Sequence, residues 1–394
     1  MTLPTLKLKP QEERRLRAGH LWIYSNEVDT AATPLPAFAA GSLCRVEDAR
    51  GHPLGTAYVN PHTLLCARLL TGRADATIDR DWFVRRIAAA LQLRERLYDQ
   101  PYYRLIYGEA DRLPGLVVDR FGDQLVVQIG TAGIEAQREV VLDALRKVLK
   151  PRGIWLANDL PARETEGLTR EAVAVGDVPD AVEIAEGGVR FSIPLRDGQK
   201  TGWFYDQRDN RDRLARYVKG ARVLDVFSYI GGWALRAAGF GAAAVSCVDA
   251  SATALERASA NAALNGHSLE TLKGDALDVL KALRAEGRQF EVVIVDPPAL
   301  IKRKKDHAAG FEHYVALNRA ALDLIAPGGY LVSCSCSFHL ETAELQRAVL
   351  RASRAAGRSL SILKQGGQGP DHPVHPAIPE TRYLKAVYCA LAAE

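Results

Sequence analysis

The chain has 394 residues, of which 47% are hydrophobic and 25% are charged. This length predicts two or three domains, and the apolar fraction excludes a disordered chain. The apolar stretches are far shorter than the ~20 residues of a membrane-spanning helix, and no segment is typical of a secretory signal. A net charge of +4 is too small to indicate a class of partner. Six irregularly spaced cysteines do not form a disulfide framework, so we expect free thiols and a cytoplasmic protein.

Residues 1–75 are predicted to form a small β-rich domain. Apolar runs at Ser42–Val46, Leu54–Val59 and Leu64–Leu69 are separated by turn signals at Gly51-His52-Pro53 and Asn60-Pro61. Such frequent turns favour a compact sheet or barrel.

Residues 76–180 are predicted to form a central α+β domain. The pattern indicates two helices and three strands in the order helix, strand, strand, helix, strand, at residues 80–98, 115–119, 124–129, 134–149 and 153–157. The first helix is indicated by apolar residues at helical spacing, including Phe83 and Ile87.

Residues 181–394 are predicted to form a Rossmann-like α/β domain. A hairpin is expected at Val182–Pro194, and residues 182–205 lead into the domain. Short β-branched runs then alternate with helical stretches, with strands expected at residues 222–227, 244–249, 269–273, 292–296, 330–335, 359–365 and 384–391. This alternation favours a mostly parallel, doubly wound sheet, which binds ligands at the carboxyl ends of its strands.

Acidic residues and glycines follow the first two of these strands. The first strand ends in Leu224-Asp225-Val226-Phe227, the loop after it contains Gly231-Gly232, and the second strand ends at Asp249. Asp249 follows Asp225 by 24 residues, a spacing typical of an acid that binds a ribose diol. The complete phosphate-binding glycine pattern is absent, which disfavours a pyrophosphate cofactor. S-adenosyl-L-methionine, an adenosyl ligand without phosphates, fits this pattern better.

Further acids follow the third and fourth strands. Asp275 is placed to bond the adenine amino group, and Asp296 precedes Pro297-Pro298, which stiffen the following loop. The alternative for the two prolines is a structural strand terminator. The functional interpretation is a carboxylate presented to a flipped base.

The sequence Ser333-Cys334-Ser335-Cys336-Ser337 ends the fifth strand. Strands four and five are neighbours in the usual order, so we expect Cys336 beside Asp296. Buried core cysteines are the alternative. A metal site with His339 is disfavoured because it lacks a complete ligand set, and no metal is expected. A thiolate that adds to C6 of a pyrimidine makes C5 electron-rich, which allows C5 to accept a methyl group.

These motifs together resemble those of class I S-adenosylmethionine-dependent RNA methyltransferases, and among them the bacterial large-subunit rRNA cytosine-C5 methyltransferases. Leu8–Val28 is similar to the PUA RNA-binding domain of that family. Gln199–Arg208 resembles the segment that leads into the catalytic domain, and Asp371-His372-Pro373 with Glu380–Lys385 resembles the C-terminal signature.

The resemblance implies roles for single residues. Cys336 matches the nucleophile and Asp296 the acid that holds the base edge. The implied cofactor-binding residues are Gln207, Asp225, Phe227, Ser228, Tyr229, Gly231, Asp249, Ala250, Asp275, Ala276, Asp296 and Pro297. One position departs from the pattern: many such enzymes carry a second cysteine, implicated in product release, where this chain has Ala299. Product release must then use another base, or the enzyme must manage without one.

The implied substrate is ribosomal RNA, with 23S rRNA expected, and the target nucleotide stays open. Two cation clusters suit RNA phosphates: Lys302-Arg303-Lys304-Lys305 and an N-terminal group that includes Lys9. Pro298 and these cations are the expected RNA contacts. The oligomeric state is open, and a homodimer is one alternative.

Three other functions compete with cytosine-C5 methylation. The first is methylation of an exocyclic amine, on guanine N2 or adenine N6, which needs no cysteine. It is disfavoured because Ala299 and Leu300, not an aromatic residue, follow the two prolines. The second is an RNA-binding assembly factor without activity, which is disfavoured because all the cofactor-binding acids are present. The third is a nicotinamide dehydrogenase, which is disfavoured because the chain lacks the phosphate-binding glycine pattern.

Overall fold

Two compact units make up the chain. The computed structural model describes residues 3–74, 76–199 and 201–393, so Lys200 of the predicted lead-in segment lies outside the described residues. The first unit contains Met1–Val182, Ile193–Tyr205 and Pro370–Thr381, and the second contains Glu183–Ser192, Asp206–Gly369 and Arg382–Glu394. Both predicted N-terminal domains fall within the first unit, and their separate boundaries stay a prediction.

The first unit begins with a five-stranded sheet in the order β1-β3-β4-β5-β2. Its strands are β1 (Thr5–Lys7), β2 (Trp22–Ile23), β3 (Ser42–Glu47), β4 (Pro53–Val59) and β5 (Ala67–Thr71), with the short helix α1 (Glu13–Arg17) between the first two. Only the pairing of β1 with β3 is parallel. A small core of leucines, valines and two buried cysteines fills this sheet.

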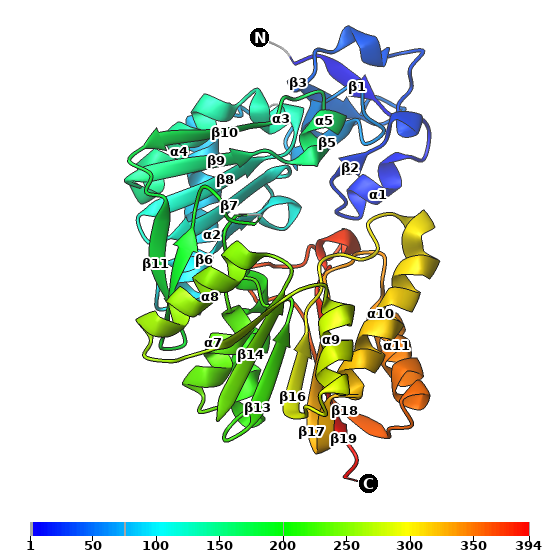
Figure 1. The fold of residues 1–394 in the computed structure, drawn as a ribbon. Helices are drawn as coiled ribbons and strands as arrows, with labels where there is room; N and C mark the ends of the chain where they lie inside the picture. Colours follow the sequence, from blue (N-terminus) through cyan, green and yellow to red (C-terminus); the bar gives the residue numbers. More distant parts are fainter. Residues whose placement is uncertain (1–2, 75, 200, 394) are drawn as a thin grey trace. The chain divides into compact units, whose positions relative to one another are not determined.

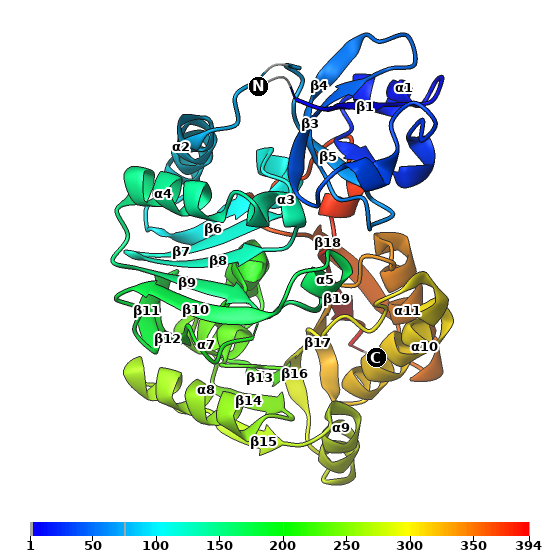
Figure 2. The same ribbon diagram turned by 90° about the horizontal axis from the view of Figure 1, so that it is seen from above.

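A second sheet of the first unit has the order β10-β9-β8-β7-β6. Its strands are β6 (Tyr102–Tyr107), β7 (Leu116–Phe121), β8 (Gln124–Ile129), β9 (Gly153–Asn158) and β10 (Glu171–Gly176). The helices of this part are α2 (Arg80–Leu97), α3 (Ala132–Glu135), α4 (Arg138–Leu149) and α5 (Pro161–Thr165). Helices α2 and α4 lie side by side along one face (Figure 2), where Phe83, Ile87 and Leu145 join the core of the sheet.

A hairpin of β11 (Ala181–Glu186) and β12 (Val189–Pro194) precedes the main sheet of the second unit. That sheet has seven strands in the order β15-β14-β13-β16-β17-β19-β18 (Figure 1; β15 is labelled in Figure 2). The strands are β13 (Arg222–Val226), β14 (Ala244–Asp249), β15 (Glu270–Lys273), β16 (Phe290–Val295), β17 (Ile325–Ser335), β18 (Leu360–Gly366) and β19 (Lys385–Leu391). Six of them run in the same direction, and β19 runs antiparallel to both of its neighbours, β17 and β18.

Helices cover both faces of the seven-stranded sheet. On one face α9 (Ala276–Ala285), α10 (His307–Leu322) and α11 (Thr342–Ala355) pack on side chains such as Val226 and Leu331. On the other face α7 (Gly232–Gly239) and α8 (Ala252–Leu264) pack on side chains such as Ile294 and Cys334. The short helix α6 (Arg208–Arg213) precedes β13. This is the doubly wound arrangement expected from the sequence.

The structure differs from the sequence prediction at a few elements. Strands β6 and β10 were not predicted, and the helix predicted at 134–149 is two helices, α3 and α4. Strand β10 lies at the edge of its sheet and is mostly exposed, so its sequence lacks the alternation of apolar and polar residues that marks a half-buried strand.

Within the described ranges, every helix is too short or too polar to cross a lipid bilayer. All six cysteines are free thiols, five of them buried and Cys336 partly exposed.

Candidate active site

The loop that follows β13 has an unusual backbone conformation. Phe227, Tyr229 and Gly231 have φ angles of 69°, 49° and 87°, which only glycine adopts at low cost. Left-handed non-glycine residues persist only where their surroundings hold them, and they concentrate at ligand sites. Here the Phe227 and Ser228 backbone N–H groups both donate to the Val248 carbonyl, at 2.9 and 3.0 Å. The loop is thereby fixed to the end of β14.

Three carboxylates gather at this edge of the sheet: Asp225, Asp249 and Asp296. Asp225 is fully buried, and its Oδ2 accepts a hydrogen bond from the Ala234 N–H at 3.0 Å. Its Oδ1 has no hydrogen-bond partner among the described residues. Burial, together with the negative charges of Asp296 and Asp249, raises the pKa of Asp225 to about 8. An unsatisfied oxygen within a group of carboxylates fits a cationic ligand, such as the amino and sulfonium groups of S-adenosylmethionine.

Asp249 and Asp275 also hold the backbone in place. The Asp249 carboxylate accepts from the N–H groups of Tyr229 at 2.9 Å and Ser251 at 2.8 Å. Asp275 is exposed and caps α9, with its Oδ1 accepting from the Leu277 N–H at 2.9 Å. The cap uses only Oδ1, so the other carboxylate oxygen, Oδ2, is available for the predicted contact with adenine, which stays a prediction. Ala250 is exposed and Ala276 is buried.

Asp296 follows β16 and is held by two side-chain donors. Its Oδ2 accepts from Gln207 Nε2 and from Trp233 Nε1, each at 2.9 Å. Gln207 is itself fixed, because its Oε1 accepts from Asn210 Nδ2 at 2.7 Å. Sequence reasoning named Gln207 only through the family resemblance and missed Trp233. The position of Trp233 one residue after the Gly231-Gly232 turn is the signal that points to it.

Cys336 lies directly after the end of β17, beside the loop that begins at Asp296. β16 and β17 are parallel neighbours, with Val295 opposite Ser333. The Cys336 Sγ is 3.9 Å from the Pro297 carbonyl oxygen, and Cys336 is only partly buried. Cys334, by contrast, is fully buried, and burial raises the pKa of its thiol well above the usual value. Of the two thiols, Cys336 is therefore the better nucleophile.

A buried hydroxyl cluster fixes the residues on both sides of Cys336. The Tyr314 hydroxyl, from α10, bonds Ser335 Oγ at 2.8 Å and Ser337 Oγ at 3.0 Å. Ser337 Oγ also accepts from the Ile301 N–H at 3.1 Å. The cluster thus connects the Cys336 segment to the loop that follows Asp296, and it limits the movement of the thiol relative to that loop.

Lys385 is a second group that sequence reasoning did not place in the site. It stands opposite Ser335 in the pairing of β17 with β19, and its Nζ donates to the carbonyls of Ser337 at 2.6 Å and Tyr383 at 2.9 Å. Burial lowers the pKa of Lys385 to about 8, and the charge of a Cys336 thiolate opposes that change. A lysine ammonium is therefore electrostatically coupled to the proposed nucleophile.

The predicted RNA contacts lie in both units. Pro298 and the cations at Lys302–Lys305 are exposed on the second unit, where Arg303 pairs with Asp306 at 3.0 Å. Lys9 is exposed on the first unit, and its Nζ donates to the Asn26 carbonyl at 2.8 Å.

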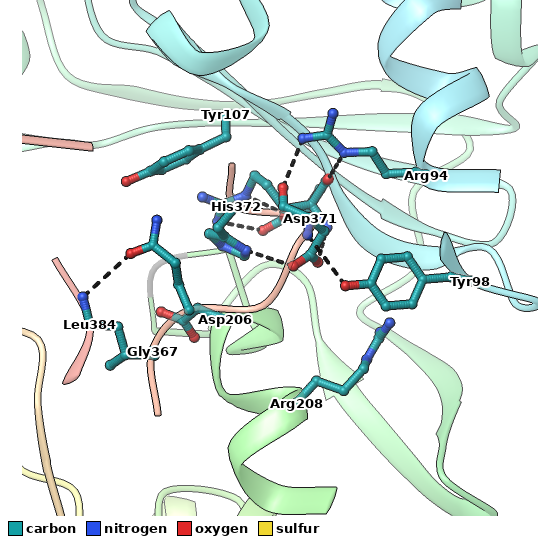
Figure 3. A network of polar contacts seen from close by, with 12 residues as sticks. Arg94, Tyr98, Tyr107, Asp206, Arg208, Gly367, Asp371, His372 and Leu384 are labelled. Atoms are coloured by element: carbon teal, nitrogen blue, oxygen red, sulfur yellow. Dashed lines mark hydrogen bonds and ion pairs between the residues drawn. The ribbon is translucent and has the colours of Figure 1, made fainter. Parts of the chain in front are cut away.

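The predicted C-terminal signature contributes a structural network to the first unit (Figure 3). Arg94 on α2 binds both oxygens of Asp111 and donates to the Asp371 carbonyl at 2.8 Å. The Asp371 carboxylate accepts from the Arg104 N–H at 2.9 Å and bonds His372 Nδ1 at 2.9 Å. Because Arg94, Asp371 and His372 are buried, the network anchors the segment 370–381 to its unit.

The buried Asp225 predicts a pH dependence of stability. Its folded pKa of about 8 exceeds the unfolded value of about 4, so between these values the folded chain holds a proton that the unfolded chain has lost. Stability must therefore fall as the pH rises through this range. The side chain of Asn cannot ionise. We therefore expect the free energy of unfolding of Asp225→Asn, relative to that of wild type, to be about 3 kcal/mol higher at pH 8 than at pH 5. Urea titration at both pH values measures this gain.

A matched control is Asp278→Asn, which changes an exposed carboxylate on α9. Its stability curve should run parallel to that of wild type. If Asp225→Asn also runs parallel, Asp225 is ionised in the folded state at neutral pH.

Comparison with known proteins identifies the family. A model described as a PUA-like domain matches residues 6–72, and a model described as an S-adenosylmethionine-dependent methyltransferase matches residues 167–379. Proteins named ribosomal RNA large subunit methyltransferase I match along nearly their whole length. The Erwinia tasmaniensis protein is 36% identical over 400 residues, covering 99% of both chains. The Aeromonas salmonicida protein is 36% identical over 384 residues, which cover 95% of this chain and 96% of that one.

Solved structures show the same fold. A protein described as an S-adenosylmethionine-dependent methyltransferase from Streptococcus mutans has a TM-score of 0.82 at 20% identity, over 98% of this chain and 100% of that chain. A methyltransferase solved in complex with SAH reaches a TM-score of 0.84 at the same identity and coverage. With a PUA-like domain, a methyltransferase domain and full-length relatives above one-third identity, this chain belongs to the ribosomal RNA large subunit methyltransferase I family.

Proposed function

We propose that this protein transfers a methyl group from S-adenosyl-L-methionine to C5 of a cytosine in ribosomal RNA, with the 23S molecule as the expected substrate. The observation that carries the proposal is the partly exposed Cys336, whose sulfur lies 3.9 Å from the Pro297 carbonyl oxygen in the Asp296–Pro298 loop. The names of the full-length relatives support an rRNA substrate. Such a substrate places the proposed activity in the cytoplasm.

The residues at the carboxyl edge of the sheet would hold the cofactor. Asp225 and the fixed loop Phe227–Gly231 would take its charged end, and Asp249 and Asp275 its ribose and adenine. When bound, the cofactor supplies an electrophilic methyl group. Asp296, oriented by Gln207 and Trp233, would hold the edge of the cytosine.

Cys336 would then act on the base itself. Its thiolate adds to C6, and the π electron pair of the C5–C6 double bond moves so that C5 becomes nucleophilic. C5 would then take the methyl group, and the electron pair of the broken carbon–sulfur bond would stay on the sulfur of the released S-adenosylhomocysteine. A base removes the C5 proton, and the electron pair left at C5 restores the double bond and expels the thiolate. A neutral Lys385 is a candidate for this base, because burial lowers its pKa to about 8.

The adduct can be trapped, and this experiment tests the proposed function. In rRNA that contains 5-fluorocytosine, C5 carries no removable proton, so the thiolate cannot leave after methyl transfer. We expect a covalent protein–RNA complex that forms only with S-adenosylmethionine present, and mass spectrometry should map it to Cys336. Catalytic methylation of rRNA without an adduct would favour the alternative, methylation of an exocyclic amine.

The cations at Lys302–Lys305 would grip RNA phosphates near the target base. All four are exposed, and three of them, the lysines, form no ion pair among the described residues. Replacing the four by alanine should weaken binding to any RNA sequence and lower the slope of log Kd against log salt concentration by about 2. A filter-binding salt titration measures both quantities.

The control for that variant is Lys219→Ala, an exposed lysine of the same unit that precedes β13, at the opposite end of the strands. It should bind RNA as wild type does. An unchanged salt slope in the quadruple variant would remove Lys302–Lys305 from the RNA-binding surface.

A further inference from the structure

A basic cavity lies in the first unit, outside the site described above. It has a volume of about 640 Å³ and is lined by residues between the end of β5 and the first turns of α2. Arg73, Arg85 and Arg86 contribute three guanidinium groups to it, and Asp79 contributes one carboxylate. The match to a PUA-like domain ends at residue 72, so the cavity begins where that domain ends.

Among the described residues, the three guanidinium groups of this cavity, those of Arg73, Arg85 and Arg86, have no carboxylate paired with them. The nearby Asp81 pairs instead with Arg80 and Lys147, at 3.7 and 3.4 Å. The Asp79 carboxylate is used as the N-cap of α2, where it accepts from the Trp82 N–H at 2.8 Å.

The arginines are also close enough to repel one another. The pKa of Arg86 is lowered, first by burial and then by the positive charges of Arg112 and Arg85. Unpaired like charges destabilise the free protein, and a bound anion removes that cost. The arrangement therefore favours an anionic ligand.

One of the three guanidinium groups is held in position. The Arg86 guanidinium carbon lies 5.1 Å from the centre of the buried Trp82 ring. Such stacking fixes a side chain that is otherwise flexible, so less freedom is lost when it binds phosphate. The capped start of α2 in turn fixes Trp82.

We propose that Arg73, Arg85 and Arg86 form a binding site for the phosphate backbone of the RNA substrate. The inference rests on the proposed function for the nature of that substrate. The site reads no base: its contacts are to phosphates, so it positions the RNA and acts alike on all sequences. It would extend the RNA-binding surface of the PUA-like domain onto α2.

The test compares RNA binding by wild type and the double variant Arg85→Gln/Arg86→Gln. Fluorescence anisotropy with a labelled fragment of large-subunit rRNA, at several KCl concentrations, gives Kd and its salt slope. We expect about tenfold weaker binding near 0.1 M salt and a slope smaller by about 1.5. Arg96→Gln is the matched control, because Arg96 is exposed on the same helix and does not line the cavity. It should change neither quantity.

Further arms separate the proposal from its alternatives. Arg73→Gln tests the same site if the double variant fails to fold, because Arg73 lies outside any helix. This single variant should lower the salt slope by about half as much as the double variant. Inorganic phosphate at 20 mM should compete for the site, with little effect on the double variant at matched ionic strength. Unchanged RNA binding in both variants overturns the proposal, and so does loss of phosphate binding without loss of RNA binding, which would indicate a small-anion site. If wild type binds rRNA but forms no adduct with 5-fluorocytosine, the proposed function fails while this site stands.

Discussion

Replacing Cys336 by alanine is expected to abolish methyl transfer to rRNA, with a loss of at least about 10³-fold in kcat. Without the sulfur no adduct forms at C6, and C5 of cytosine is too weak a nucleophile to accept a methyl group. The fold should survive, because Cys336 is only partly buried and follows the end of β17. Transfer of a radiolabelled methyl group to rRNA, followed by digestion to nucleosides, measures both the rate and the product.

The matched control is Cys334→Ala, two residues earlier on the same strand. Cys334 is fully buried against the helices α7 and α8, so this variant should lose about 1 kcal/mol of stability and keep its activity within a few-fold. If Cys334→Ala abolishes adduct formation and Cys336→Ala does not, the roles assigned to the two thiols are wrong. If both variants remain active, the methylated position must be an exocyclic amine of the base and not C5 of cytosine.

The contrast between these cysteines shows how far the sequence alone could go. Because parallel strands of a doubly wound sheet follow a regular order, the segments ending in Asp296 and Cys336 could be assigned to neighbouring strands. The register of β16 with β17 agrees with that assignment. Alternation along a strand could not decide which of two cysteines on the same face is accessible, since that depends on where β17 ends.

Other parts of the site had no local signal. Tyr314 comes from the middle of α10 and Lys385 from the start of β19, and each reaches Ser337 only through tertiary packing. A tyrosine on a helix is an ordinary core residue, and a lysine at the start of a strand usually lies in solvent. Likewise, Arg85 and Arg86 on α2 are typical surface residues until the cavity brings them together with Arg73.

The antiparallel end of the sheet is what makes Lys385 relevant to Cys336. The pairing of β19 with β17 places Lys385 opposite Ser335, and the Lys385 ammonium donates to the carbonyl of Ser337, so it contacts the residue that follows Cys336. Two backbone carbonyls accept from this ammonium, and it forms no ion pair with a carboxylate in the described part of the chain. The coupling between Lys385 and Cys336 acts equally in both directions, so a charged lysine must favour the thiolate.

Lys385→Met is therefore expected to slow alkylation of Cys336 by iodoacetamide about tenfold at pH 7, because the fraction of thiolate falls. Since the pKa of Lys385 is lowered to about 8, most of the lysine is charged at pH 7 and little of it above pH 9. The difference from wild type should thus be largest below pH 8 and should shrink at higher pH. Mass spectrometry of the Cys336 peptide, without RNA or cofactor, measures the rate at each pH.

Two further variants make this result specific to the charge. Lys385→Arg keeps a cation and should recover most of the reactivity at pH 7, whereas Lys364→Met changes an exposed lysine on β18 and should have no effect. Lys385→Met removes a buried charge, so the variant should still fold, and a melting curve checks this. Equal alkylation profiles for wild type and Lys385→Met would show that the ammonium does not act on the thiol. Equal profiles would exclude activation of the nucleophile by Lys385. If Lys385→Met then has a lower kcat with an unchanged KM, the role of Lys385 would be removal of the C5 proton.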